Sequence, residues 1–277
     1  MREGDILKSA RTTFIEAKNI LITAGAGIGV DSGLPDFRGN EGFWRAYPPI
    51  AKLGISFTEM ANPSWFDRDP GLAWAFYGHR LNLYRRIVPH NGFKRLLEHI
   101  RLNHHNYFIF TSNVDGQFQK AGFEENLIEE CHGSIHAMQC SVPCSHEIWS
   151  SAATDIMIDE KRFRAMPPYP TCPLCGAIAR PNILMFGDWG WLSERTQAQD
   201  NRLEAWLQRH FQTNGKNVII EIGAGTAVPT VRYFSEDVAA RFNAPLIRIN
   251  PRDYLVPQGH LGISMDAEAG ICEIVPA

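Results

Sequence analysis

Two close pairs of cysteines carry the clearest chemical signal in this 277-residue sequence. Cys140 and Cys144 form the first pair, and Cys172 and Cys175 form the second within Cys-Pro-Leu-Cys-Gly. Structural zinc takes four thiolates in a tetrahedron, and a tight turn can present two sulfurs at a time. We therefore predict a structural Zn²⁺ site with these four cysteines as its ligands.

Two alternatives to this zinc site stay open at the level of the sequence. His136 or His146 could replace one of the thiolates, or the cysteines could be free and buried, as we expect for Cys131 and Cys272. Paired cysteines in a chain of this length favour metal ligation in a reducing compartment over a disulfide framework.

A glycine-rich loop follows the apolar run of residues 19–24, which is short and continuous and so predicts a buried parallel strand. The loop of residues 25–29 would let main-chain N–H groups approach a diphosphate closely. It lacks the third glycine of the strict dinucleotide fingerprint and a ribose-binding carboxylate about 20 residues further on, so a turn without a ligand is the alternative. Asp36, Phe37 and Arg38 favour a nucleotide, because they offer an acceptor, a flat apolar face and a cation.

Polar side chains also follow two further predicted strands. Residues 111–115, Thr-Ser-Asn-Val-Asp, come after the apolar run 107–110, and His132 comes after 126–130. Ligands of open α/β sheets bind at the carboxyl ends of the strands. His132 is a candidate general base, because an imidazole with a pKa of about 6.5 is neutral at physiological pH; a structural role is the alternative.

The segment of residues 40–90 is predicted to be helical. Its aromatic-rich first half, residues 43–66, is broken by prolines and should form short helices over a cleft. An amphipathic helix over 71–87 places Tyr77 and Arg80 on one face. A buried Tyr77 and a solvated Arg80 explain this pair as well as a binding role does.

The strands and helices that position these residues alternate along the chain. This alternation predicts a doubly wound parallel α/β sheet, Rossmann-like, with a small zinc-ribbon and helical module. The predicted strands are 19–24, 107–110, 126–130, 217–222, 244–250 and 271–275; the other helices are 5–18, 93–102 and about 203–211; and 180–188 is a strand or extended segment.

We predict that the two small modules interrupt one large domain. Residues 40–90 form the helical module over the cleft, and residues 134–180 form the zinc-binding small domain. The three parts of the Rossmann-like domain are residues 1–39, 91–133 and 181–277.

Composition excludes several functional classes. The chain is 44% apolar with a formal charge of −3, which suits one large domain plus a smaller one and argues against broad nucleic-acid binding. No apolar run approaches the roughly 20 residues of a membrane helix, and the N-terminal residues have no secretory pattern. We expect a cytoplasmic protein with neither nucleic-acid nor membrane partners.

Five ordered motifs resemble those of the sirtuins, the NAD-dependent protein deacylases. They are Gly25–Arg38, Thr111–Asp115, His132–Ser134, Cys172–Gly176 and Arg180–Asp188. The resemblance spans nearly the whole chain. It implies an NAD-binding Rossmann-like domain, a structural Zn²⁺, and acyl-lysine proteins or peptides as substrates.

The resemblance also implies a role for individual residues. His132 would be the general base, Asn113 a second catalytic residue, and Asp115 the acceptor for the nicotinamide carboxamide. Cys272 would lie near the adenine. The residues implied to bind NAD are Gly25, Ala26, Gly27, Asp36, Phe37, Arg38, Ser112, Asn113, Asp115, Gly223, Ala224, Gly225, Asn250 and Cys272.

In the implied reaction, the acyl oxygen of a modified lysine attacks the ribose carbon as nicotinamide leaves. His132 then activates a ribose hydroxyl, which gives free lysine and O-acyl-ADP-ribose. Sirtuins with Phe-Tyr-x-x-Arg use that Tyr and Arg to hold the carboxylate of succinyl- or malonyl-lysine. The implied substrate-binding residues are Tyr77 and Arg80, and a main-chain ladder of Ile183, Leu184, Met185 and Phe186 that receives the peptide as an added strand.

Three positions depart from the family pattern. Gly29, Ser112 and the pair Ala224-Gly225 replace Ser, Gln and Thr-Ser, so three side-chain contacts to NAD are shortened or lost, each worth about 0.5–1.5 kcal/mol. These changes motivate an alternative, an ADP-ribosyltransferase or NAD hydrolase on the same fold. An alternative of another class is a zinc-ribbon module that binds nucleic acid or a protein partner.

Overall fold

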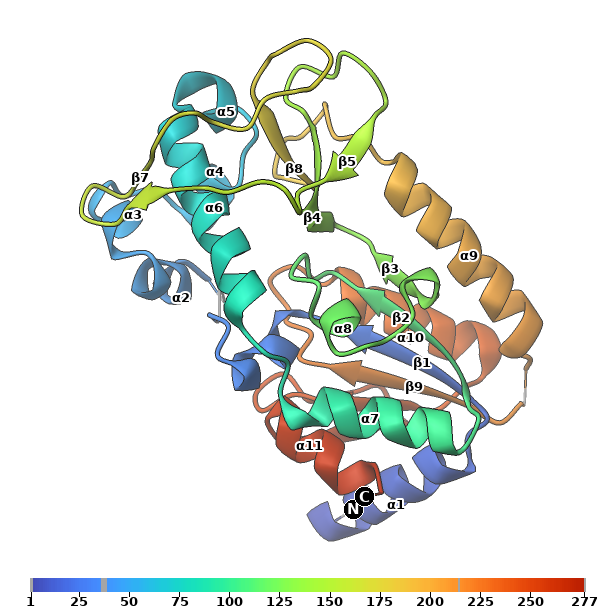
Figure 1. Cartoon of the computed structure of the whole chain (residues 1–277). Coiled ribbons are helices and arrows are strands. Elements are labelled where there is room, and N and C mark those ends of the chain that lie inside the picture. Colours follow the sequence, from blue (N-terminus) through green and yellow to red (C-terminus); the bar gives the residue numbers. More distant parts are fainter. Residues whose placement is uncertain (1, 36–38, 214, 277) are drawn as a thin grey trace.

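A parallel six-stranded sheet forms the larger part of the molecule (Figure 1). The computed structural model describes residues 2–35, 39–213 and 215–276. The strands lie in the order β11-β10-β9-β1-β2-β3, and every neighbouring pair is parallel. Their bounds are β1 (Asn19–Ala24), β2 (Asn106–Thr111), β3 (Ile128–Glu130), β9 (Asn217–Ile222), β10 (Leu246–Ile249) and β11 (Leu261–Ile263).

Helices cover both faces of this sheet, which confirms the doubly wound parallel fold. One face packs against α1 (Glu3–Glu16), α7 (Asn91–Leu102) and α11 (Ala267–Ile274), and the other against α9 (Glu194–His210) and α10 (Thr230–Phe242). Short helices η1 (Ala26–Ser32), α8 (Gln117–Lys120) and η2 (Glu125–Leu127) join the elements. Among the helices within the described ranges, none is both long and apolar enough to cross a membrane.

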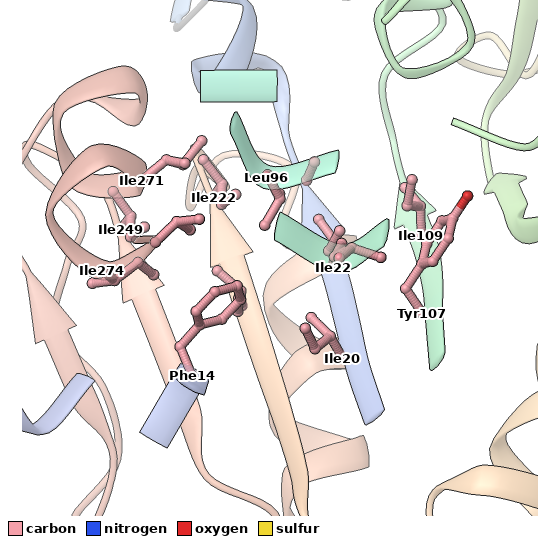
Figure 2. Close-up of a cluster of buried hydrophobic side chains, with 14 of the residues drawn as sticks. Phe14, Ile20, Ile22, Leu96, Tyr107, Ile109, Ile222, Ile249, Ile271 and Ile274 are labelled. Atoms are coloured by element: carbon pink, nitrogen blue, oxygen red, sulfur yellow. The ribbon is translucent and has the colours of Figure 1, made fainter. Parts of the chain in front are cut away.

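Side chains of the central strand β1 alternate between the two faces. Ile20 and Ile22 join the buried cluster of α1, α7 and α11 drawn in Figure 2, whereas Leu21 joins the cluster of α9 and α10. The hydroxyl of Thr23 lies 2.7 Å from that of Ser235 on α10. The apolar run of β1 is therefore buried on both faces, as a continuous run predicts.

A second part of the molecule lies above the sheet in Figure 1. It contains a three-stranded antiparallel sheet of order β5-β4-β8 and a short hairpin. One buried cluster joins its helices to these strands, with Phe43 and Phe76 on the helical side and Met138 on β4. The elements are α2 (Gly39–Ala46), α3 (Pro48–Lys52), α4 (Phe57–Met60), α5 (Trp65–Arg68), α6 (Pro70–Arg86), β4 (Gly133–Cys140), β5 (Ile148–Ser150), β6 (Ile158–Asp159), β7 (Arg164–Ala165) and β8 (Ala179–Ile183).

The predicted final strand over residues 271–275 is wrong, because these residues lie in and just after α11. Ile271 and Ile274 are three residues apart on this helix, and both are buried against the sheet. A Cβ on Gly270 would come within 2.4 Å of Ile249, so α11 packs closely against β10. A short apolar run fits the period of a helix as well as that of a strand. The sequence pattern also did not predict β11, which pairs with β10 at the edge of the sheet.

Helix α9 begins at Glu194, well before the apolar pattern near residue 203 indicates it. Its polar first half covers the edge strand β3. The N–H of Glu130 donates to Gln199 Oε1 at 3.1 Å, and the Glu130 carboxylate pairs with Arg195. These polar contacts take the place of a neighbouring strand at the edge of the sheet. The polar first half of α9 has no apolar periodicity, so the sequence pattern did not predict this part of the helix.

Glu129 on β3 is buried beneath α9 without a full set of partners. Its side chain is 4% exposed, and its Oε2 atom has no hydrogen-bond partner within the described ranges. Burial raises the pKa of Glu129 to about 8, and the nearby carboxylates of Asp200 and Glu204 add to the rise. The glutamate is therefore mostly protonated at neutral pH.

We predict that Glu129→Gln stabilises the fold, and more so at alkaline pH. The unfolded glutamate ionises near pH 4.5 whereas the folded one ionises near 8, so ionisation of the unfolded chain weakens the fold as pH rises through this window. A neutral amide removes this effect. Thermal unfolding should show Tm higher by about 2–6 °C at pH 8 and nearly unchanged at pH 4.5. A Tm gain of equal size at both pH values, or none, would contradict the assignment; exposed Glu273→Gln is the control.

Candidate active site

A cavity of about 600 Å³ lies where β1, β2 and β9 end, between the sheet and the second part of the molecule. Its lining draws on the glycine loops, the polar turn after β2, helix α6 and the segment after β8. The predicted site residues that it brings together are Gly25, Ala26, Gly27, Tyr77, Arg80, Ser112, Asn113, Asp115, His132, Ile183, Leu184, Met185, Phe186, Gly223, Ala224 and Gly225.

Main-chain contact between the two glycine loops shapes one wall of this cavity. The N–H of Gly27 donates to the carbonyl of Gly223 at 2.9 Å. A Cβ on Gly223, whose φ is +65°, would lie 2.3 Å from the nitrogen of Ile28, and a Cβ on Gly25 would lie 2.8 Å from Cα of Ala224. Larger residues would push the loops apart. A second cavity of about 270 Å³ shares Gly27 and Gly223 with the first, so the two cavities adjoin at this contact.

The side chain of Asn250 is hydrogen-bonded to the loop after β9. Its amide donates to the carbonyl of Ala224 at 2.8 Å, and its side-chain oxygen accepts from the N–H groups of Arg252 and Asp253. Neither Asn250 nor Cys272, on α11, is among the residues that line the two cavities. Asp36, Phe37 and Arg38 lie outside the described residues.

Asn113 and Asp115 enter the cavity from the turn after β2. The Asn113 amide donates to the carbonyl of Gly25 at 3.1 Å, which ties this turn to the first glycine loop. Asp115 accepts the N–H of Gln117 at 2.9 Å, and burial raises its pKa to about 6. The carboxylate is mostly ionised at neutral pH and can act as an acceptor there.

His132 follows β3 and lines the same cavity. Its Nε2 atom lies 3.5 Å from the hydroxyl of Thr230, at the start of α10. Burial lowers the pKa of His132 below its ordinary value, so the imidazole is neutral and able to take a proton at pH 7. Thr230 was not predicted, because a threonine after proline gives no signal of its own in the sequence.

Tyr77 and Arg80 face the cavity from α6 and are both buried, at 1% and 8% exposure. The interpretation of Arg80 as a solvated side chain is therefore wrong. Its Nε and Nη2 atoms donate to the hydroxyl of Tyr84 at 3.0 and 2.8 Å. Tyr84 also lines the cavity. The sequence analysis did not single it out, although its spacing of four residues from Arg80 places both on one helix face.

The segment after β8 lines the cavity and is held in place by several bonds. The buried ion pair of Arg180 and Asp188 is bidentate, at 2.6 and 2.9 Å. Main-chain N–H groups along the segment are already bonded: that of Leu184 to the carbonyl of His132, that of Met185 to Asp188, and that of Phe186 to the carbonyl of Ala61. A peptide strand at residues 183–186 could not use the N–H groups of residues 184–186, so the predicted ladder stays a prediction with this constraint.

The four predicted metal ligands form one cluster. The sulfur atoms of Cys140, Cys144, Cys172 and Cys175 all lie within 4.8 Å of one another, and two of the pairs are 3.6 Å apart. Tetrahedral zinc with Zn–S bonds of about 2.3 Å needs sulfurs about 3.8 Å apart, so this cluster fits a structural Zn²⁺.

The alternative histidine ligands point elsewhere. His136 Nε2 contacts the carbonyl of Asp115 at 2.9 Å, and the ring of His146 pairs with Glu194. Neither belongs to the cysteine cluster found among the described residues.

The chain belongs to the Sir2 family, whose pattern it matches over residues 25–229. A relative from a strain of Thermus thermophilus, curated as an NAD-dependent protein deacylase, is 29% identical over 98% of this chain and 94% of its own length. A relative of the same description from Aquifex aeolicus is 29% identical over 86% of each chain.

Solved structures share this fold. A mutant Sir2 homologue in complex with ADP-ribose superposes with a TM-score of 0.72 at 23% identity, over 97% of this chain and 94% of its own. A Sir2 homologue in complex with NAD superposes with a TM-score of 0.69 at 22% identity, over 99% and 93%.

The departures from the sirtuin pattern lie in two different settings. Ser112, Ala224 and Gly225 line the main cavity. Gly29 lines neither cavity, and a Cβ there would come within 2.7 Å of Leu34 Cδ1. A serine at position 29 would therefore have to displace Leu34, which itself lines the main cavity.

We predict that the native protein holds one zinc per chain and that Cys172→Ser lowers both zinc content and stability. Metal binding and folding of such a module are linked, so Tm should fall by about 5–10 °C, and a strong chelator should act likewise on the wild type. Zinc analysis and thermal unfolding measure both effects. Cys131→Ser, outside the cluster, should keep the zinc. A wild type purified with no stoichiometric zinc would refute the assignment.

Proposed function

We propose that this Sir2-family protein is an NAD-dependent deacylase of lysine side chains in proteins, releasing nicotinamide and O-acyl-ADP-ribose. The observation that carries the proposal is the convergence of two glycine loops, Asn113, Asp115 and His132 on one cavity at the ends of neighbouring strands. The names of the curated relatives support it.

The groove over the two glycine loops fits a dinucleotide. Glycine at positions 25 and 223 keeps the loops in main-chain contact, so peptide groups rather than side chains form this wall. We propose that Gly25, Ala26 and Gly27 hold the diphosphate and that the residues after β9 lie around the adenosine. When bound, NAD supplies the ADP-ribosyl group that accepts the acyl group as nicotinamide leaves. Roles for Asp36, Phe37, Arg38, Asn250 and Cys272 in binding NAD stay predictions.

His132 acts as the general base in this proposal. A neutral imidazole can take the proton of a ribose hydroxyl, and Thr230 lies near its Nε2 atom. Asp115 accepts a hydrogen bond from the nicotinamide carboxamide. Asn113 holds the turn after β2 against the first glycine loop while its side chain lines the cavity.

Protein substrates and NAD are the partners that this function requires. The formal charge of −3 supports our proposal that nucleic acid is not a partner, because nucleic-acid binding normally needs a basic surface. Cysteines kept for a metal rather than for disulfides support a cytoplasmic location.

We predict that His132→Ala lowers kcat/KM for deacylation by at least about 100-fold, because a positioned general base contributes a factor of this order. Mass spectrometry of an acetyl-lysine peptide incubated with NAD measures the loss. Tm and zinc content should stay at wild-type values. His210→Ala, at the end of α9, is the matched control and should keep full activity.

The wild-type pH profile tests the same residue. Burial lowers the pKa of His132 below its ordinary value and raises that of Asp115 to about 6, so both groups are in their active states at pH 7 and gain a proton as the pH falls below 7. Activity should fall on acidification through this range. Full activity of His132→Ala at pH 7 would rule out the proposed base.

We further propose that Tyr77 and Arg80 favour acyl groups that end in a carboxylate, such as succinyl and malonyl. Both side chains are buried in the cavity wall, where a guanidinium binds a carboxylate strongly. Acetyl-lysine would still enter, with this end of the cavity less well filled.

Arg80→Met should lower the ratio of kcat/KM for succinyl-lysine to that for acetyl-lysine by about 100-fold, because a buried charged hydrogen-bond pair contributes about 1.5–3 kcal/mol. Competition between the two peptides, followed by mass spectrometry, gives this ratio directly. Arg209→Met, which changes an exposed arginine on α9, should leave it unaltered. Equal losses on both peptides would reject the acyl preference.

A further inference from the structure

Three side chains of α6 form one stripe along the cavity wall. Tyr77, Arg80 and Tyr84 are separated by three and four residues, line the cavity and are each less than a tenth exposed. The hydroxyl of Tyr84 accepts two hydrogen bonds from the same guanidinium, at 3.0 Å from Nε and 2.8 Å from Nη2. Arg80 is thus held by the residue one helical turn further along.

The opposite side of α6 is fixed to the segment before β6. A Cβ on Gly78 would come within 2.4 Å of Ile156, so helix and segment are in close contact. The Asn82 amide donates to the carbonyl of Ile156 at 3.1 Å, and Arg85 donates to the carbonyls of Ser151 and Thr154 at 2.7 Å. These contacts attach α6 to this segment while Tyr77, Arg80 and Tyr84 face the cavity.

Aromatic rings confine the flat guanidinium as well. The Cζ atom of Arg80 lies 5.3 Å from the ring centre of Phe76 and 5.5 Å from that of Tyr84. Such contacts attract a cation to the face of a ring. The two hydrogen bonds to Tyr84 add direction, because they fix the edge that carries Nε and Nη2.

We propose that Tyr84 is the positioning residue for Arg80, and that its hydroxyl sets the preference of this cavity for acyl groups with a terminal carboxylate. The inference rests on the proposed deacylase function and adds to the Tyr-x-x-Arg pair a third residue, so that the recognition unit reads Tyr77-x-x-Arg80-x-x-x-Tyr84. Tyr84 acts through Arg80 and need not touch the acyl group.

A phenol suits this task better than a carboxylate would. Burial raises the pKa of Tyr84, so its hydroxyl is uncharged at neutral pH even beside Arg80. A neutral acceptor orients the guanidinium without cancelling the positive charge that an anionic acyl group needs. Among the described residues, Tyr47, Tyr77 and Asp115 also act electrostatically on Arg80 or Tyr84, and burial raises the pKa values of Tyr47 and Tyr77 as well.

Tyr84→Phe tests the proposal, since it removes the hydroxyl and keeps the ring. The ratio of kcat/KM for a succinyl-lysine peptide to that for an acetyl-lysine peptide should fall about tenfold, which is about 1.4 kcal/mol. The fall should appear in KM for the succinyl peptide, because positioning of a remote carboxylate is a binding effect. Tyr107→Phe is the matched control: its hydroxyl accepts the N–H of Glu124 away from the cavity, and its removal should leave the ratio unchanged.

A double-mutant cycle separates positioning from a merely structural role. In the Arg80→Met background, Tyr84→Phe should cause no further fall in the ratio, because the group that it positions is absent. The affinity of the succinyl peptide measured by calorimetry without NAD should follow the same pattern.

The outcomes are distinct from those of the proposed function. A tenfold fall in the single variant that vanishes in the Arg80→Met background supports the proposal. An unchanged ratio in Tyr84→Phe, or an equal fall in both backgrounds, overturns it while the deacylase function stands. A wild type that deacylates neither peptide refutes the function itself.

Discussion

The main-chain contact between the loops after β1 and β9 is the constraint on which the rest of the site depends. Gly27 donates to Gly223 across neighbouring strand ends, and a Cβ on Gly223 or Gly25 would collide with backbone on the opposite loop. Because strands β2 and β3 continue the same parallel sheet, Asn113 and His132 arrive at this edge as well. Strand order and this loop contact together place a wall of peptide groups beside one amide, one carboxylate and one neutral imidazole.

Buried charges hold the opposite wall in place. Asp188 and Arg180 form a fully buried bidentate pair that fixes the segment after β8, and breaking such a pair by removing one partner costs about 3–5 kcal/mol. Tyr84 holds Arg80 through two hydrogen bonds to its uncharged hydroxyl. The first arrangement cancels a charge to build a scaffold, whereas the second keeps a charge oriented toward the cavity. The cysteine cluster lies outside this lining, and one of its members, Cys140, ends β4 in the small antiparallel sheet that carries β8.

Patterns with a single physical meaning were predictable from the sequence. The continuous apolar runs predict β1 and β9, the paired cysteines predict one cluster of four sulfurs, and the polar residues after strands predict that Asn113, Asp115 and His132 meet at one edge of the sheet. Features that depend on a tertiary partner were not. Ile271 fits the period of a strand as well as that of a helix, and only the sheet beside it decides in favour of α11. The hydrogen bonds of Tyr84 with Arg80 and the close approach of Leu34 to Gly29 are seen only in the structure. The role of Asp36, Phe37 and Arg38 stays a prediction.

Three residues of the cavity lining differ from the sirtuin pattern: Ser112, Ala224 and Gly225. The central question is therefore whether this protein releases nicotinamide only when an acylated peptide is present. The most direct measurement is nicotinamide release by the zinc-containing wild type with NAD, in the absence of peptide and with acetyl-, malonyl- or succinyl-lysine peptide, at pH 7.5. A deacylase should release nicotinamide only with acylated peptide, in equal amount to the free lysine formed, and fastest with the acidic acyl groups. Release at the same rate without any peptide would contradict this account and establish an NAD hydrolase.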